Sequence, residues 1–273
     1  MDSAAPDAPP TALRWSGITD PGRFRANNED AFLVVNFDAR EVRYLGKDGE
    51  GPLAAADYVF AVSDGMGGAK SGEVASRIAV EKIAHLMPAS FQLGAQRIDA
   101  GFSDVLEELF EQCNEALLEL GRYYEECHGM GATLTLCWFM PGWMAYGHVG
   151  DSRLYYLPKD APMVQVSLDD TYPGRLFHAG KLSEREARSH PRKHLLDQVL
   201  GGKSSRFEPQ IGRVAYQPGD RFLICSDGLV DGMWDRRIDE MARGELSATR
   251  LVEYAVAESG RDNTTALIIE ALP

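Results

Sequence analysis

The sequence has no long apolar run and no recognisable leader. None of its apolar stretches is long enough to form a membrane-spanning helix. The first twelve residues, MDSAAPDAPPTA, contain neither the basic nor the apolar segment of a signal peptide. We therefore expect a disordered tail over residues 1–12, one domain over residues 13–273, and a cytoplasmic protein with no membrane partner.

The sequence is also poor in cysteine, and no C-x-x-C pair is present. Its four cysteines are Cys113, Cys127, Cys137 and Cys225, three of them in apolar surroundings. This favours buried free thiols in a reducing compartment over a disulfide framework or a zinc site.

Basic charge is scarce as well. There are 41 acidic and 28 basic residues, for a formal net charge of −13. Nucleic-acid binding needs a basic face to neutralise phosphates, so we expect no nucleic-acid partner. The acidic excess favours solubility, and part of it is available to gather around metal cations.

Several catalytic motifs are missing. There is no G-x-S-x-G nucleophile elbow and no H-E-x-x-H zinc motif. The glycine-rich stretch DGMGGAKSG (64–72) departs from the phosphate-binding loop G-x-x-x-x-G-K-[ST], because Ala69 precedes Lys70. His190 and His194 have no neighbouring nucleophile motif, so we expect them to be surface residues rather than catalytic ones.

Short strands alternate with a few helices along the chain. Apolar periodicity predicts long helices over 71–87 and 102–124, and shorter ones after Ser183 and over 248–258. We interpret the segment 36–58 as a solvated loop. β-branched and aromatic runs predict strands over 31–37, 58–63, 132–140, 143–149, 153–157, 221–226 and 264–272. This order predicts an α+β fold, in which antiparallel β-sheets form a layered sandwich with helices packed on a face.

Acidic residues stand at the ends of these strands. One explanation is that Asp-Gly is simply a common turn after a buried strand. The other is that the carboxylates converge at one edge of a sheet, where their repulsion favours bound Mg²⁺ or Mn²⁺. The positions concerned are Glu29-Asp30, Asp64, Asp151, Asp227 and Asp262.

Six motifs in order resemble those of the metal-dependent PP2C (PPM) protein serine/threonine phosphatases of bacterial type. The similarity runs from about Ile18 to Ile269, and it implies that family's sandwich of two antiparallel sheets flanked by helices, an αββα arrangement. The motifs are RFRANNED (23–30), SDGMGG (63–68), GMGATL (129–134), GDSR (150–153), SDGL (226–229) and GRDNTT (260–265).

The resemblance implies a binuclear Mn²⁺ or Mg²⁺ centre. Asp64 would bridge the two ions. Glu29 and the backbone carbonyl of Gly65 would bind one of them, and Asp227 and Asp262 the other. Two such ions lower the pKa of a water molecule and clamp an in-line displacement, so no covalent phosphoenzyme is needed.

Four further roles follow from the same resemblance. Arg25 corresponds to the arginine that binds the substrate phosphate, for which its bidentate fork is suited. Asp30 would orient the attacking water, and Asn263 would support the site. Asp151, together with Asp227, matches the ligands of a third, weaker metal ion.

The sequence departs from the family pattern at three places. Met66 stands where eukaryotic members have a histidine proposed as general acid, which leaves the acid unidentified. Ala132 replaces a common threonine. Asp170 replaces a frequent histidine, within a stretch that matches the flap bordering the site (167–191).

We therefore expect a monomeric phosphatase that acts on proteins phosphorylated on serine or threonine, with a cognate serine/threonine kinase as a candidate partner. Two rivals stay open. The first is a phosphatase-like domain that binds metals or phosphoproteins without turnover. The second is a structural cation-binding domain, which leaves Arg25 without a role.

Overall fold

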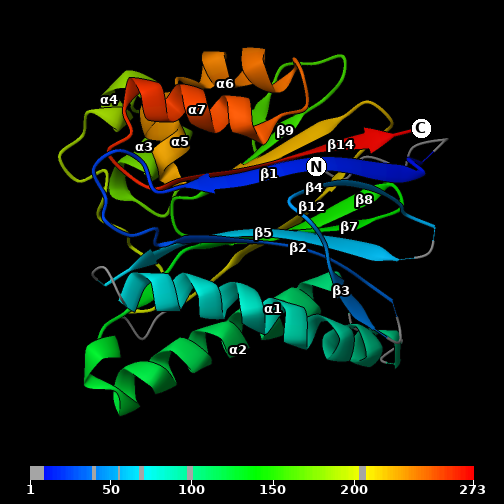
Figure 1. The fold of residues 1–273 in the computed structure, drawn as a ribbon, viewed down its shortest axis with the longest axis horizontal. Helices are drawn as coiled ribbons and strands as arrows, with labels where there is room; N and C mark the ends of the chain where they lie inside the picture. Colours follow the sequence, from blue (N-terminus) through cyan, green and yellow to red (C-terminus); the bar gives the residue numbers. More distant parts are fainter. Residues whose placement is uncertain (1–8, 39–40, 55, 68–70, 97–100, 203–206) are drawn as a thin grey trace.

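Two antiparallel β-sheets stacked face to face form the centre of the computed structural model, which describes residues 9–38, 41–54, 56–67, 71–96, 101–202 and 207–273 (Figure 1). The first sheet has six strands in the order β10-β9-β13-β14-β1-β4. Its strands are β1 (Ala12–Asp20), β4 (Asp48–Pro52), β9 (Arg153–Leu157), β10 (Val164–Gln165), β13 (Arg221–Cys225) and β14 (Thr264–Leu272).

The second sheet has eight strands. Its main path is β11-β6-β5-β7-β8-β12, and β2 pairs with both β5 and β3 beside this path. Its strands are β2 (Asp30–Phe37), β3 (Val42–Tyr44), β5 (Asp57–Met66), β6 (Gly131–Ala132), β7 (Leu134–Met140), β8 (Trp143–Val149), β11 (Leu200–Gly201) and β12 (Gln210–Ala215).

Helices cover the outer face of each sheet. The long helices α1 (Ser71–Gln96) and α2 (Phe102–Tyr123) lie on the eight-stranded sheet, at the bottom of Figure 1. The short η1 (Glu125–Cys127) follows α2. Over the six-stranded sheet and one end of the sandwich lie α3 (Tyr172–His178), α4 (Glu184–Arg188), α5 (Asp227–Gly232), α6 (Asp235–Ala242) and α7 (Ala248–Glu258).

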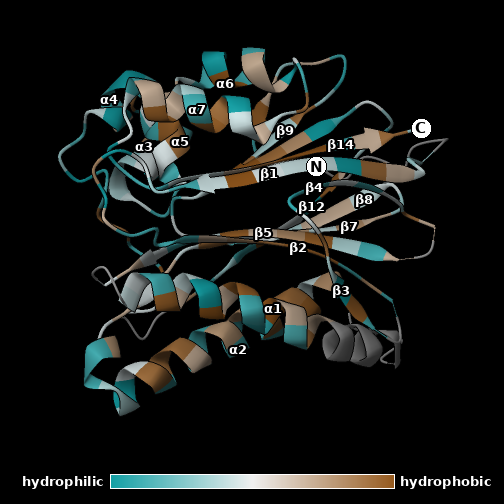
Figure 2. Ribbon diagram, in the orientation of Figure 1, coloured by the Kyte–Doolittle hydropathy of each residue, from teal (hydrophilic) through white to brown (hydrophobic). Residues whose placement is uncertain are grey.

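Three apolar layers hold these elements together, and Figure 2 shows apolar residues along the strands of both sheets. Phe110 and Met87 belong to the layer between the long helices and the eight-stranded sheet. Phe60 and Phe222 belong to the layer between the sheets, where the aromatic rings meet edge to face. Ile238 represents the third layer, under α5, α6 and α7. The αββα sandwich expected from the sequence is thus confirmed.

Most expected elements are present. All seven predicted strands correspond to observed ones, and the segment 132–140 divides into β6 and β7. The helix after Ser183 is α4, and it has the complete capping box with Glu186 that the spacing predicted.

The expectation of a solvated loop over 36–58 was wrong, because this segment contains β3 and β4. β4, with the sequence DGEGP, pairs with β1 along the sheet edge. Its two glycines make room for aromatic rings: a Cβ on Gly49 would lie 2.4 Å from the indole of Trp15, and one on Gly51 would lie 2.1 Å from the hydroxyl of Tyr58. A glycine strand of this kind has no apolar alternation for a sequence pattern to detect.

At the N-terminus, β1 begins at Ala12, and the backbone N–H of Thr11 already donates to Leu272 O at 3.1 Å. The first eight residues of the predicted tail lie outside the described residues. Across the described ranges, we find no helix with both the length and the apolar character needed to cross a membrane.

Candidate active site

Strand pairing brings the predicted acidic residues to one end of the sandwich, on the left in Figure 1. On the eight-stranded sheet, Asp30 opens β2 and lies directly opposite Asp64 near the end of β5. The neighbouring Glu29 accepts a hydrogen bond from Gly65 N through its backbone oxygen at 3.0 Å. Two turns far apart in sequence are therefore held against each other.

The six-stranded sheet delivers its carboxylates to the same end. Cys225, the last residue of β13, pairs with Ala266 of β14 and with Arg153 of β9. Asp227, just after β13, is consequently close to the chain that enters β14 through Asp262. Asp151, just before β9, lies on the other side of Asp227, and both residues face one cavity.

This cavity has a volume of about 460 Å³. Met66, Thr133 and His194 line it together with seven of the nine residues expected at the site. Those seven are Arg25, Glu29, Asp64, Gly65, Asp151, Asp227 and Asp262. His194 is exposed, as expected, but it lies at this rim, with Nδ1 3.9 Å from an Asp227 oxygen.

Asp30 lies buried behind the cavity and joins the two sheets. Its Oδ2 accepts hydrogen bonds from Ser226 Oγ, directly after β13, at 2.6 Å and from Thr265 Oγ1 of β14 at 2.7 Å. Burial raises the pKa of Asp30 to about 6. The sequence analysis did not assign Ser226 and Thr265 a role, although both stand inside its motifs SDGL and GRDNTT.

Asn263 does not line the cavity, and it braces the loop that carries Arg25 and Glu29. Its Oδ1 accepts from Glu29 N at 2.8 Å, and its Nδ2 donates to the backbone oxygens of Pro21 and Asn27 at 2.9 Å each. The side chain is buried, so these three bonds fix the loop against the start of β14.

Gly65 occupies a position that no side chain fits. A Cβ there would lie 1.9 Å from the backbone oxygen of Gly72 at the start of α1, and 3.0 Å from Glu29 O. The close approach leaves the backbone of Gly65 at the cavity wall beside Asp64. Gly68 of the same motif lies outside the described residues.

Arg25 supplies positive charge at the cavity mouth. Its guanidinium donates to an Asp262 oxygen at 2.6 Å, and about half of its side chain is exposed. A planar guanidinium in this position is able to receive a phosphate oxygen pair from the solvent side.

The cavity holds more negative charge than the chain neutralises. Burial and then the neighbouring carboxylates raise the pKa of Asp64 and Asp227 well above the usual value. Burial, followed by the charge of Asp169, raises the pKa of Asp151 to about 7. We call the cavity-lining acids the carboxylate cluster: Glu29, Asp64, Asp151, Asp227 and Asp262.

These residues fit hard divalent cations. The buried Oδ1 of Asp227 has no hydrogen-bond partner among the described residues, and a carboxylate oxygen of this kind is what Mg²⁺ and Mn²⁺ prefer. In the part of the chain that the structure describes, no group of three histidine, cysteine or acidic side chains already has the geometry to hold a metal ion. A cation here would therefore take further ligands from backbone carbonyls and from water.

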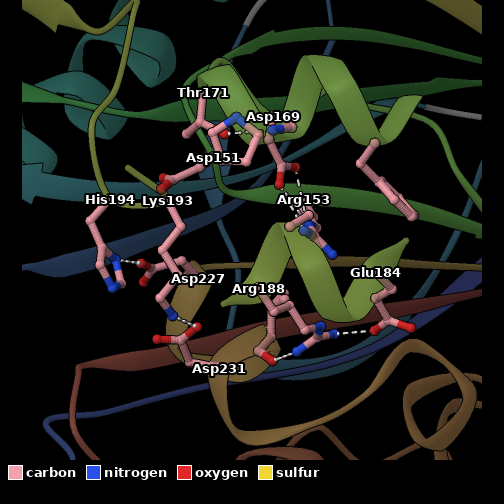
Figure 3. Close-up of a pocket in the computed structure, with 15 residues that line it drawn as sticks. Asp151, Arg153, Asp169, Thr171, Glu184, Arg188, Lys193, His194, Asp227 and Asp231 are labelled. Atoms are coloured by element: carbon pink, nitrogen blue, oxygen red, sulfur yellow. Dashed lines mark hydrogen bonds and ion pairs between the residues drawn. The ribbon is translucent and has the colours of Figure 1, made fainter. Parts of the chain in front are cut away.

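A second ionic group, which we call the flap-base cluster, lies next to the first (Figure 3). Arg153 is buried and makes a bidentate contact with Asp169, with its Nη2 2.7 Å and its Nε 2.9 Å from the carboxylate oxygens. Arg188 of α4 donates to Asp235 at 3.2 Å. The cluster consists of Arg153, Asp169, Arg188 and Asp235, and it fastens the segment 167–196 beside the cavity.

Asp170, which departs from the family pattern, is hydrogen-bonded to the backbone of Gly150. It accepts a hydrogen bond from Gly150 N at 2.9 Å, and its backbone N–H donates to Gly150 O at 2.7 Å. Asp170 therefore holds the turn that presents Asp151. Lys193 and His194, further along the same segment, reach Asp231 and Asp227 of α5 (Figure 3).

Comparison with known proteins gives a consistent result. The family model for protein phosphatase 2C matches residues 51–260. The serine/threonine protein phosphatase PstP of Mycobacterium tuberculosis is 32% identical over 266 residues, which are 95% of this chain and 45% of PstP. The chain thus spans about half the length of the PstP sequences.

One further protein and one solved domain are similar over nearly the whole of the compared chain. The serine/threonine phosphatase stp of Listeria innocua is 28% identical over 257 residues, which cover 92% of this chain and 93% of stp. A crystal structure of the PstP catalytic domain in complex with two manganese ions superposes with a TM-score of 0.75 at 30% identity, covering 96% of this chain and 99% of that one. With the fold, the motif positions and the family match in agreement, the chain belongs to the protein phosphatase 2C family.

Proposed function

We propose that this chain hydrolyses phosphoserine and phosphothreonine in proteins, with Mn²⁺ or Mg²⁺ as cofactor. The observation that carries the proposal is the cavity in which carboxylates from both sheets face the guanidinium of Arg25. The phosphatase names of PstP and stp, and the two manganese ions in the PstP structure, support it.

The residues of the carboxylate cluster divide into ligand groups. Asp64 would be shared by two ions, with Glu29 and the Gly65 carbonyl on one side and Asp227 and Asp262 on the other. Asp151 and Asp227 would hold a third ion. When bound, such ions activate water at neutral pH and offset the charge of the phosphate.

The chain's own side chains then bind and orient the reactants. Arg25 would bind the phosphate, exchanging its contact with Asp262 for phosphate oxygens. Ser226 and Thr265 hold one oxygen of Asp30, so its other oxygen is available to accept a hydrogen bond from the attacking water. Met66 carries no proton for the leaving alkoxide and so does not serve as the general acid.

The cavity lining favours direct attack by water over a covalent phosphoenzyme. Among the described residues that line it, there is neither a serine nor a cysteine. The hydroxyl of Thr133 accepts a hydrogen bond from Asp64 N at 2.9 Å and contacts Ser152 Oγ at 2.8 Å, so it is engaged in the wall.

Location and partners form part of the proposal. The four cysteines are free, and three of them are buried, which supports a reducing, cytoplasmic environment. We propose a monomer whose substrates are phosphorylated by a cognate serine/threonine kinase.

The test is hydrolysis of p-nitrophenyl phosphate and of a phosphothreonine peptide, with Mn²⁺ or with EDTA. We expect phosphate release with the metal and none with the chelator. Arg25→Ala should raise KM for both substrates, because the phosphate loses its bidentate partner. If metal binds but no substrate is hydrolysed with any of several divalent cations, the protein is a non-catalytic binding domain. If, in addition, Arg25→Ala has no effect on any measured property, a purely structural cation site is favoured.

A further inference from the structure

A basic groove lies beside the carboxylate cluster and is not used by the proposed chemistry. It is an open depression of about 370 Å³ between α4, the start of α6 and the turn before β14. We propose that this groove binds acidic residues that flank the phosphorylated residue of a protein substrate. The inference rests on the proposed function and adds a substrate preference to it. The residues that carry the argument are Arg185, Arg188, Lys193, Asp231, Trp234 and Arg261.

The groove adjoins the catalytic cavity at two points. Arg261 immediately precedes Asp262 of the carboxylate cluster. Asp231 lies four residues after Asp227 on α5, which is about one helical turn. A peptide whose phosphorylated residue occupies the cavity would therefore place neighbouring residues over the groove.

The charge of the groove is opposite to that of the whole molecule. Its lining includes four basic residues and one acidic residue, Asp231, whereas the full chain has a formal net charge of −13. Asp231 is already paired, with its oxygen 2.8 Å from Lys193 Nζ. A concentrated basic surface on an acidic protein attracts an acidic partner and repels a basic one.

Two of the arginines are available for such a partner. Arg185 and Arg261 are exposed, and within the described residues their guanidinium groups make no ion pair or hydrogen bond. They belong to segments far apart in sequence, α4 and the turn before β14. Cations on separate segments suit a run of carboxylates along a peptide better than a single compact anion.

Arg188 and Trp234 give the groove a firm wall. The Arg188 guanidinium stacks on the Trp234 ring at 4.8 Å from its centroid, and it also contacts Glu184 at 2.7 Å. Trp234 is nevertheless 51% exposed. A fixed aromatic surface beside free guanidinium groups can take the apolar stems of aspartate and glutamate while their carboxylates meet the arginines.

The experiment compares phosphothreonine peptides that share one core and differ only in their flanks, which carry either Asp and Glu or Asn and Gln. With Mn²⁺ present, we expect the acidic peptide to have a KM about three- to tenfold lower, since each exposed ion pair contributes modestly. The advantage should shrink as ionic strength rises. An unphosphorylated acidic peptide carrying a fluorophore should bind in an anisotropy titration, which reports on the groove without turnover.

The variants are Arg185→Glu, Arg261→Glu and the double substitution, with Arg122→Glu on the distant helix α2 as the control, because Arg122 is also exposed. We expect the double variant to lose both the acidic preference and the anisotropy signal, and to hydrolyse p-nitrophenyl phosphate at the wild-type rate. Arg185→Lys should retain most of the preference.

The same measurements separate failure of the proposed function from failure of the proposed substrate preference. If neither peptide nor p-nitrophenyl phosphate is hydrolysed by the wild type, the proposed function fails. If all are hydrolysed but the acidic peptide has no advantage, or keeps it in the double variant, the groove is not a docking surface for acidic residues and this inference is overturned.

Discussion

The carboxylate cluster and the flap-base cluster are neighbours that differ in charge balance: acids outnumber basic residues in the first and equal them in the second. The two clusters meet at the turn Asp151–Arg153; Asp169 of the flap-base cluster is buried, and the acids of the carboxylate cluster line the cavity. In the flap-base cluster, two arginines contact two aspartates. In the carboxylate cluster, five acids have one arginine, Arg25, and it sits at the exposed mouth.

This difference indicates that the flap-base cluster stabilises the fold and that the carboxylate cluster is suited to binding cations. A buried charge that is paired and hydrogen-bonded serves as a fixed part of the fold. Carboxylates gathered without enough cations repel one another, and burial together with this repulsion raises the pKa of Asp64 and Asp227. In the flap-base cluster, the arginines balance the charge of the aspartates. In the carboxylate cluster, the negative charge is balanced only when cations are added.

The largest effect on activity should come from neutralising one acid of the carboxylate cluster. Asp64→Asn is expected to lower kcat/KM by more than about a thousandfold, because the ligand that we propose to be shared by two metal ions is lost. Its metal-free form should be as stable as the wild type or more stable, since one of several repelling charges is removed. Steady-state kinetics and urea unfolding in EDTA measure the two effects.

Asp220→Asn is the matched control for this prediction. Asp220 is fully buried and accepts hydrogen bonds from Tyr156, Lys159 and Gln217 at 2.7 to 3.0 Å, far from the cavity. It should lose stability and keep its kcat/KM. If Asp64→Asn instead destabilised the metal-free protein as Asp220→Asn does, the contrast between the clusters would be wrong.

Removing an arginine from the flap-base cluster should lower the stability of the protein. Arg153→Met leaves the Asp169 carboxylate without its bidentate partner, which should lower the free energy of unfolding by about 3 kcal/mol. Urea denaturation with saturating Mn²⁺ measures this, with the exposed Arg122→Met as the control. A loss below about 1 kcal/mol would show that the cluster is not a structural anchor.

Added metal should stabilise the folded protein by binding to the carboxylate cluster and not to the flap-base cluster. At a free Mn²⁺ concentration a hundred times its Kd, binding should raise the free energy of unfolding by about 2.7 kcal/mol. Thermal unfolding with Mn²⁺ and with EDTA measures the shift. Arg153→Met should retain the metal-induced increment, and Asp64→Asn should lose most of it; equal increments in the two variants would contradict the assignment of the site.

The sequence predicted which residues gather at the cavity, because these residues stand in short motifs at strand ends. Register then determines their convergence: Asp30 faces Asp64, and Cys225 lies between Ala266 and Arg153. The positions were predictable from local pattern, but the ligand roles themselves stay predictions until metal binding is measured.

Other features depend on contacts that no local pattern encodes. β4 forms because glycines let it cover the rings of Trp15 and Tyr58, which belong to other strands. The pairing of Arg188 with Asp235 joins two helices 47 residues apart in the chain. His194 appeared to be an ordinary surface residue, and only the path of its segment over α5 brings it to the rim of the cavity.

The smallest effect concerns an ion group away from the site, in which one arginine, Arg14, is about half exposed. Glu270 on β14 contacts Arg14 and, at 2.9 Å, Arg221. Partial burial acts to raise its pKa, but hydrogen bonds from both arginines lower the pKa overall. A lowered pKa in the folded state means that stability is present above the unfolded pKa near 4.5 and is lost as the pH falls below it. Glu270→Gln should therefore cost about 1 kcal/mol or less at pH 7, and this difference should vanish in acid. A cost that persists unchanged at low pH would show that Glu270 contributes through packing rather than through its charge.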